Sequence, residues 1–173
     1  MSDGGIEILQ NLIRELQPVW PFLHYIAYLI GACIAIASLK SFCDQNTSKA
    51  GSLISLIACA AMLSLPTVLD SLALTLFGKT SLHSLSYTRL DDSPTQLYIN
   101  VAVYLIQIVG IISIIKAFYM MTLIRRSNDP SLSPRIWSHL IGGICCVNPT
   151  EFIKMLGATV GGEIQSSISA LIS

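Results

Sequence analysis

The side chains that could bind a metal or attack a substrate are few in this sequence and widely spaced. Three histidines occur, at His24, His83 and His139, with no paired spacing and no HExxH motif. Zinc sites need ligands clustered at characteristic spacings, so the sequence predicts neither a bound metal nor another cofactor. The chain also lacks a phosphate-cradling glycine loop, a nucleophile elbow and a basic stretch suited to nucleic acid. These features argue against an enzyme, a small-molecule substrate and a nucleic-acid partner.

The cysteines show a packing pattern more than a reactive one. Cys43 lies in a polar stretch, whereas four others lie inside apolar runs without a CxxC motif: Cys33, Cys59, Cys145 and Cys146. An odd count with no secretory framework argues against a structural set of disulfides. Adjacent Cys145 and Cys146 would point to different sides of a helix, so we interpret them as small packing residues.

Carboxylates buried inside apolar runs would indicate a proton relay or ion coupling. Asp70 and Glu151 instead lie toward the ends of such runs. An ion-coupled transporter is therefore poorly supported, and it would require a buried carboxylate elsewhere.

The elements that must hold all these side chains are long apolar helices. The chain has 173 residues, of which 53% are hydrophobic and 12% are charged, whereas about a quarter of the residues in a soluble domain are charged. Three runs contain no Asp, Glu, Lys or Arg: residues 21–39, 51–69 and 97–115. A helix needs about 20 apolar residues to cross a hydrocarbon core of about 30 Å. We interpret each run as a membrane helix.

A fourth apolar run, residues 136–147, is interrupted by the sequence NPT around Pro149 before apolar residues resume. The second run contains a similar LPT around Pro66. Proline is tolerated in a membrane helix where neighbours satisfy the freed backbone groups, so both prolines are expected to kink their helices. We expect residues 136–156 to form a kinked fourth span; the alternative is a re-entrant or interfacial segment.

Two stretches of the chain are similar to each other: YLIGACIAIASLKSF at residues 28–42 and YLIQIVGIISIIKAF at residues 104–118. Their shared Tyr, Lys and Phe are harder to ascribe to composition than their shared Leu and Ile. Each stretch is followed by a run of small residues that ends in Pro-Thr. We interpret this as an internal duplication; the alternative is two unrelated pairs of helices with similar composition.

The expected fold class is an all-α integral membrane protein with four transmembrane helices, arranged as two tandem helical hairpins, plus amphipathic N- and C-terminal helices. One membrane domain, residues 1–173, would comprise an amphipathic helix (1–17), a first hairpin (20–77), a polar linker (78–96), a second hairpin (97–160) and an amphipathic tail (161–173). The first helix would lie on the membrane surface or on a partner. Aromatic rings at Trp20, Tyr25 and Tyr28 would lie near the membrane interface, which such rings prefer.

Basic residues gather beside two of the polar loops. Six of the ten are found there: Lys40, Lys49, Lys116, Arg125, Arg126 and Arg135. Loops on the cytoplasmic side of a membrane collect Lys and Arg, so both termini and the linker are expected outside the cytoplasm. The two hairpins then have the same orientation, as a parallel repeat requires. Four of the basic residues would anchor the helices at the cytoplasmic side: Lys40, Lys116, Arg125 and Arg126. No removable signal peptide is visible.

Small residues recur at spacings that let membrane helices approach closely. They are Ala27, Gly31 and Ala35 in the first run, Gly142 and Gly143 in the fourth, and Gly157 and Gly161, which form a GxxxG motif. Such faces pack helices within one chain, or pack the chain against other membrane subunits or a second copy of itself.

A short polar stripe suggests a different class of protein. Asn100, Tyr104 and Gln107 fall on one helix face, as in a small pore or a holin-like permeability protein, but the stripe ends before residues 109–115.

Several motifs resemble those of a known family. The segment LQNLIRELQPVWPFLHYIAYLIG, residues 9–31, is similar to the N-terminal signature of the IcmC/DotE family, inner-membrane subunits of Dot/Icm-type (type IVB) secretion systems. Further matches follow in order: LPTVLDSLALTLFG (65–78), Tyr87, IVGIISIIKAF (108–118) and HLIGGICCVN (139–148). The sequence departs from the family pattern at Lys116, Ala117 and Pro149.

The resemblance implies a non-catalytic, multi-pass protein of a bacterial inner membrane. It would support the export of effector proteins by an intracellular bacterium, and its partners would be the lipid bilayer and other subunits of the secretion apparatus. A pilin-like subunit that polymerises is a variant of this interpretation.

Overall fold

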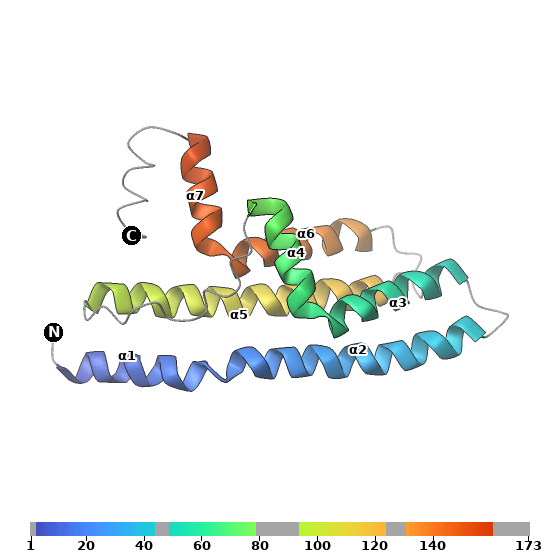
Figure 1. The fold of residues 1–173 in the computed structure, drawn as a ribbon, viewed down its shortest axis with the longest axis horizontal. Helices are drawn as coiled ribbons and strands as arrows, with labels where there is room; N and C mark the ends of the chain where they lie inside the picture. The colour runs from blue at the N-terminus through green and yellow to red at the C-terminus, as the bar shows by residue number, and fades with distance from the viewer. Residues whose placement is uncertain (1–2, 44–48, 79–93, 124–130, 161–173) are drawn as a thin grey trace.

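The computed structural model describes residues 3–43, 49–78, 94–123 and 131–160, and the regular elements within these ranges are all α-helices (Figure 1). They are α1 (Asp3–Leu16), α2 (Val19–Cys43), α3 (Lys49–Leu63), α4 (Leu65–Phe77), α5 (Pro94–Leu123), α6 (Leu132–Val147) and α7 (Pro149–Val160). The expected linker and C-terminal tail fall mostly or wholly outside the described residues.

The order of helix lengths repeats along the chain. In the first half a helix of 25 residues, α2, is followed by helices of 15 and 13 residues. In the second half a helix of 30 residues, α5, is followed by helices of 16 and 12 residues. Each short pair is divided next to a proline, Pro66 or Pro149. The two halves thus have the same succession of elements, as the similar stretches in the sequence suggest.

The helices α2, α3, α5 and α6 form the body of the molecule. α2 packs against α3, α5 packs against α6, and α3 joins the two halves through its contact with α5. The core between them contains Ala27, Met62, Ile111, Ile114 and Val147. From this body α4 and α7 project on the same side, roughly across the direction of the long helices (Figure 1).

Proline determines where the short helices divide. Pro66 has no N–H to continue the ladder of α3, and it stands in the first turn of α4, where its fixed φ suits a helix start. The chain turns by 94° between α3 and α4. At the far end of α4, Gly78 adopts a left-handed conformation with φ 68° and donates its N–H to the Leu74 carbonyl at 2.9 Å.

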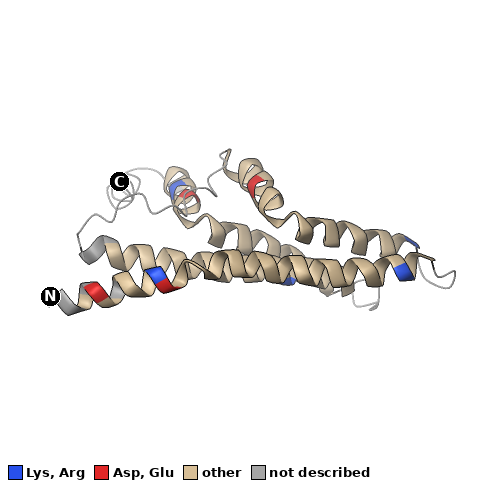
Figure 2. Cartoon of the chain, turned by 60° about the horizontal axis from the view of Figure 1, so that its bottom comes forward, with Lys and Arg blue, Asp and Glu red and all other residues tan. Residues whose placement is uncertain are grey.

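Among the residues that the structure describes, two helical stretches are long and apolar enough to cross a membrane. They are Gln10–Cys43, which runs from α1 through α2, and Leu97–Leu123 in α5; the bent pair α3–α4 adds a third if it is counted as one span. Charged residues are sparse along the long helices (Figure 2). Lys40 is the only Lys, Arg, Asp or Glu in α2. The structure therefore confirms the expected all-helical fold, and two of its helices are compatible with a membrane by length and composition.

The N-terminal helix α1 packs against α5. Ile13 is buried with Leu97 and Val101 in a small apolar cluster separate from the main core. The Tyr104 hydroxyl donates a hydrogen bond to the Leu16 carbonyl at 2.6 Å, where α1 ends. The sequence led us to expect this helix on the membrane surface or on a partner, and in the structure its partner is the chain's own α5.

Candidate functional site

The backbones of α5 and α6 approach closely where the two helices cross, and we call this the glycine crossing (Gly110 and Gly143). A Cβ atom on Gly110 would lie 2.8 Å from the Gly143 carbonyl oxygen and 2.8 Å from the Val147 nitrogen. Both neighbours are backbone atoms, which cannot rotate away. A Cβ on Gly143 would meet Ile114 Cγ1 at 2.5 Å and the Gly110 carbonyl oxygen at 2.9 Å. The two helix backbones therefore touch directly.

Hydrogen bonds on either side of the glycine crossing link the same two helices. The Gln107 side-chain amide donates to the Val147 carbonyl at 3.2 Å. Val147 is the last residue of α6, and the carbonyls of a final helical turn lack intrahelical donors. Gln107 thus supplies a donor at the point where Pro149 prevents the helix from continuing.

Ser113 makes the second link. Its hydroxyl donates to the His139 carbonyl at 3.0 Å and lies 3.1 Å from His139 Nδ1. The imidazole of His139 is thereby engaged in a contact between helices.

A second contact, between α2 and α3, uses residues of the small-residue face in the first apolar run. A Cβ on Gly31 would lie 3.0 Å from Met62 Cβ, and Ala27 is fully buried in the core, while Ala35 is half-buried. Farther along the same pair, the hydroxyl oxygens of Ser38 and Ser55 lie 2.6 Å apart, and both residues are buried.

The structure separates the glycines of the second half. Gly143 faces α5, whereas a Cβ on Gly142 would meet no atom within 4 Å, so Gly142 lies on an open face of α6. Gly157 is buried in α7, and Gly161 lies outside the described residues. Gly110 was not singled out from the sequence. The available signal was that it is the only glycine in the 30 residues of α5, since an isolated glycine inside a helix usually has a packing reason.

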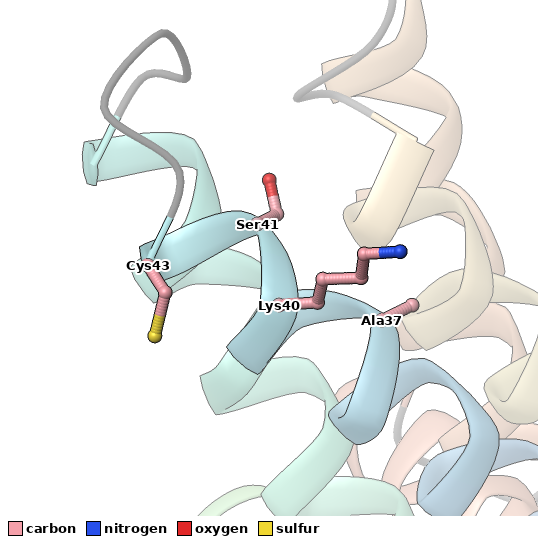
Figure 3. A pocket seen from close by; sticks show the side chains of 4 residues that line it. All are labelled: Ala37, Lys40, Ser41 and Cys43. Carbon is pink, nitrogen blue, oxygen red and sulfur yellow. The ribbon is translucent and has the colours of Figure 1, made fainter.

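The basic residues expected as anchors are found at exposed positions where the structure describes them. Lys40 is exposed in the last turn of α2, where its charge favours the helix dipole. Together with Ala37, Ser41 and Cys43 it lines a shallow recess of about 430 Å³, and its side chain extends away from the helix (Figure 3). Lys116 is exposed on α5. Arg125 and Arg126 lie outside the described residues.

The residues considered for chemistry are not brought together. Within the described ranges, no three His, Cys, Asp or Glu side chains gather as metal ligands would. The cysteines of these ranges are all free thiols, with Cys59 buried and Cys145 and Cys146 half-buried. The described side chains instead form close contacts between helices, which involve glycines, serines and one glutamine.

The polar stripe on α5 points toward the chain's own backbone. Tyr104 is buried and donates to the Leu16 carbonyl, and Gln107 donates to the Val147 carbonyl. Asn100 is half-buried. Two of the three polar side chains are thus used in contacts between helices.

Comparison with known proteins gives no relative: no protein-family model, curated protein or solved structure matches the chain.

Proposed function

We propose that the protein is a non-catalytic inner-membrane subunit of a type IVB secretion apparatus, similar to the IcmC/DotE family. The observation that carries the proposal is the order and spacing of the family-like motifs along nearly the whole chain. These motifs fall on α1 and α2, on α4, and on the parts of α5 and α6 that form the glycine crossing. They therefore coincide with the elements that determine how the helices pack.

In this proposal the chain crosses the membrane four times as two helical hairpins of the same orientation. The bent pairs α3–α4 and α6–α7 would each serve as the returning span of a hairpin. Both termini and the linker would be periplasmic, because Lys40, Lys116 and the other clustered basic residues would mark the cytoplasmic side. Little of the chain would then lie in water, which suits a subunit that acts by packing against others.

Surfaces for such packing are available on the outside of the helical body. Large apolar side chains are exposed along α2, among them Phe22, Leu29 and Ile36. On α6, the exposed Trp137 and Ile141 flank the open face at Gly142. In lipid, close approach of small residues and dispersion between such faces drive helix association. We propose that other membrane subunits of the apparatus cover part of these faces.

A pore is a weaker proposal because Tyr104 and Gln107 make hydrogen bonds within the chain. A direct test is to express the protein alone in a heterologous bacterial inner membrane. We expect no leakage of a small dye, and leakage would favour the permeability protein.

The decisive experiment is chemical crosslinking in the native host, followed by detergent solubilisation and identification of the proteins that co-purify. We expect other membrane subunits of a secretion apparatus. The variant Gly142→Leu should reduce specific crosslinks while leaving the helicity and size of the purified protein unchanged. Recovery of the protein without any subunit of such an apparatus would contradict the proposal.

Orientation is tested by labelling single cysteines with an impermeant reagent in a cysteine-free background. We expect Ser84→Cys to be labelled from outside the cytoplasmic membrane, and Ser48→Cys and Ser127→Cys to be protected until the membrane is opened. The reverse pattern would refute the proposed orientation.

A further inference from the structure

An open groove of about 420 Å³ lies between the start of α2 and the side of α4. Aromatic and apolar side chains form most of its wall, and a single acidic residue provides the only formal charge. The lining residues are Trp20, Pro21, His24 and Tyr25 from α2 and Pro66, Leu69 and Asp70 from α4. Aromatic faces beside one carboxylate are the features that attract an organic cation.

The carboxylate of Asp70 has no counter-ion in the described part of the chain. Asp70 is half-buried, and no ion pair involves it among these residues. The corresponding short helix of the second half also carries one carboxylate, Glu151, but there Lys154 lies 3.1 Å away. Asp70 thus places a negative charge on the wall of the groove, which makes the groove complementary to a positive charge.

His24 determines which kind of cation the groove favours. Its Nδ1 lies 2.9 Å from the Trp20 carbonyl oxygen, so Nδ1 carries a proton and donates it. In the neutral ring, Nε2 is then an acceptor. The lining therefore offers a carboxylate and a second acceptor, which suit an ammonium with N–H groups to donate. A quaternary ammonium has no such donors, and a headgroup whose only charge is negative would be repelled by Asp70.

The groove lies where a lipid headgroup would lie in the proposed membrane orientation. Trp20 and Tyr25 stand near the start of α2, and such rings prefer the membrane interface. Because α3 packs along α2 and α4 leaves α3 at 94°, the first turns of α4 lie beside these rings at the start of α2. Phe22 and Leu29 are exposed on the same face of α2 as Tyr25 and offer an apolar path away from the groove.

We propose that this groove binds a phospholipid with a primary ammonium headgroup, such as phosphatidylethanolamine. The ammonium contacts Asp70 and the faces of Trp20 and Tyr25, and an acyl chain lies along Phe22 and Leu29. The inference rests on the membrane placement within the proposed function and is independent of the secretion apparatus.

The test is native mass spectrometry of the full-length protein in detergent, equilibrated with equal amounts of phosphatidylethanolamine, phosphatidylglycerol and phosphatidylcholine. We expect the wild type to retain phosphatidylethanolamine about tenfold more than either other lipid. Asp70→Asn should abolish this preference. Glu151→Gln, the matched change in α7, should preserve it, because Glu151 already has a lysine partner.

A second variant guards against a folding defect in Asp70→Asn. The Tyr25 side chain is 75% exposed, so Tyr25→Leu leaves the core intact. It should weaken retention of phosphatidylethanolamine about threefold, as expected from the loss of one cation–π contact.

Three results would overturn the lipid site: equal retention of the three lipids by the wild type, an unchanged preference in Asp70→Asn, or displacement of the lipid by free ethanolamine or a lysine-containing peptide. The last result would assign the groove to a soluble amine or to a protein lysine. Failure to recover secretion subunits by crosslinking would contradict the proposed function and leave the lipid result standing.

Discussion

Gly110 and Gly143 place the backbones of α5 and α6 in direct contact, with the stem of Ile114 filling the space beside Gly143. In a bilayer, apolar side chains gain little by leaving lipid for each other, so helix association depends on close packing and on interhelical hydrogen bonds. The glycine crossing supplies the first of these, and Gln107 and Ser113 supply the second on either side. Its residues should therefore dominate the stability of this helix pair.

We predict that Gly110→Ala destabilises the protein by about 1–3 kcal/mol, because the new methyl group meets two backbone atoms at 2.8 Å. The measurement is unfolding in detergent, followed by helical circular dichroism. Gly142→Ala is the matched control: its methyl group enters open space, and the better helix propensity of alanine should leave stability unchanged or higher by up to about 1 kcal/mol. Equal effects of the two substitutions would contradict the close crossing.

Gln107 should matter because it provides a donor for a carbonyl at the end of α6. We predict that Gln107→Leu lowers stability by about 1–2 kcal/mol in the same assay, since the Val147 carbonyl loses that donor. Ser113→Ala should cost less, because the His139 carbonyl lies inside α6, where the helix itself supplies a donor. A larger loss for Ser113→Ala than for Gln107→Leu would show that the end of α6 does not depend on Gln107.

At the scale of elements, the prolines predict where helices end but not where the chain goes next. The sequence places breaks at Pro66 and Pro149, and the structure has them there. After the 94° turn at Ser64, Leu65 and Leu69 are buried in a core shared with residues of α5 and α6. These contacts are distant in sequence, so local pattern cannot specify the direction of the turn.

The similar stretches of α2 and α5 likewise show that matching residues in the sequence can have different surroundings in the structure. Tyr28 and Tyr104 occupy matching positions, yet Tyr28 is 59% exposed and Tyr104 is 5% exposed. The reason is that the end of α1 covers Tyr104 and accepts its hydrogen bond. An amphipathic α1 could be predicted from its spacing of apolar residues, whereas its docking on α5 could not.

We predict that Ile13→Asp detaches α1 from α5, because Ile13 is 5% exposed in the cluster with Leu97 and Val101. Loss of that burial removes about 1.5–3 kcal/mol of apolar stabilisation, which corresponds to roughly tenfold or more faster amide exchange in α1. The exchange rates of the α1 amides are measured by hydrogen exchange of the purified protein. Ile8→Asp is the control, since Ile8 is 70% exposed, and its α1 amides should remain as protected as in the wild type. Unchanged protection in Ile13→Asp would mean that α1 does not depend on this contact.

For the whole molecule, the helices differ in how far they reach. At about 1.5 Å per residue, the 25 residues of α2 extend about 37 Å and the 30 residues of α5 about 45 Å. The 15 residues of α3 and the 16 of α6 extend only about 22–24 Å before their prolines. A hydrocarbon core is about 30 Å thick, so α3 and α6 are each too short to cross it before the chain bends.

In the proposed four-span arrangement, in which α3 and α6 enter the membrane, this mismatch predicts a preference for thin bilayers. Where the core is thicker than α3 and α6, either the bilayer thins around the protein or the starts of α4 and α7 are drawn into the core, and both responses cost free energy that grows with thickness. We therefore expect the thermal stability of the reconstituted protein to be highest in phosphatidylcholine with 14-carbon chains and to fall steadily toward 22-carbon chains. A protein whose spans were four straight helices as long as α2 would show its maximum at longer chains. Substituting Pro66 by Ala separates the two cases. If the bend sets the preferred bilayer thickness, a straighter α3–α4 pair should move the stability maximum toward longer lipid chains. An unmoved maximum would show that α2 and α5 alone set the preferred thickness.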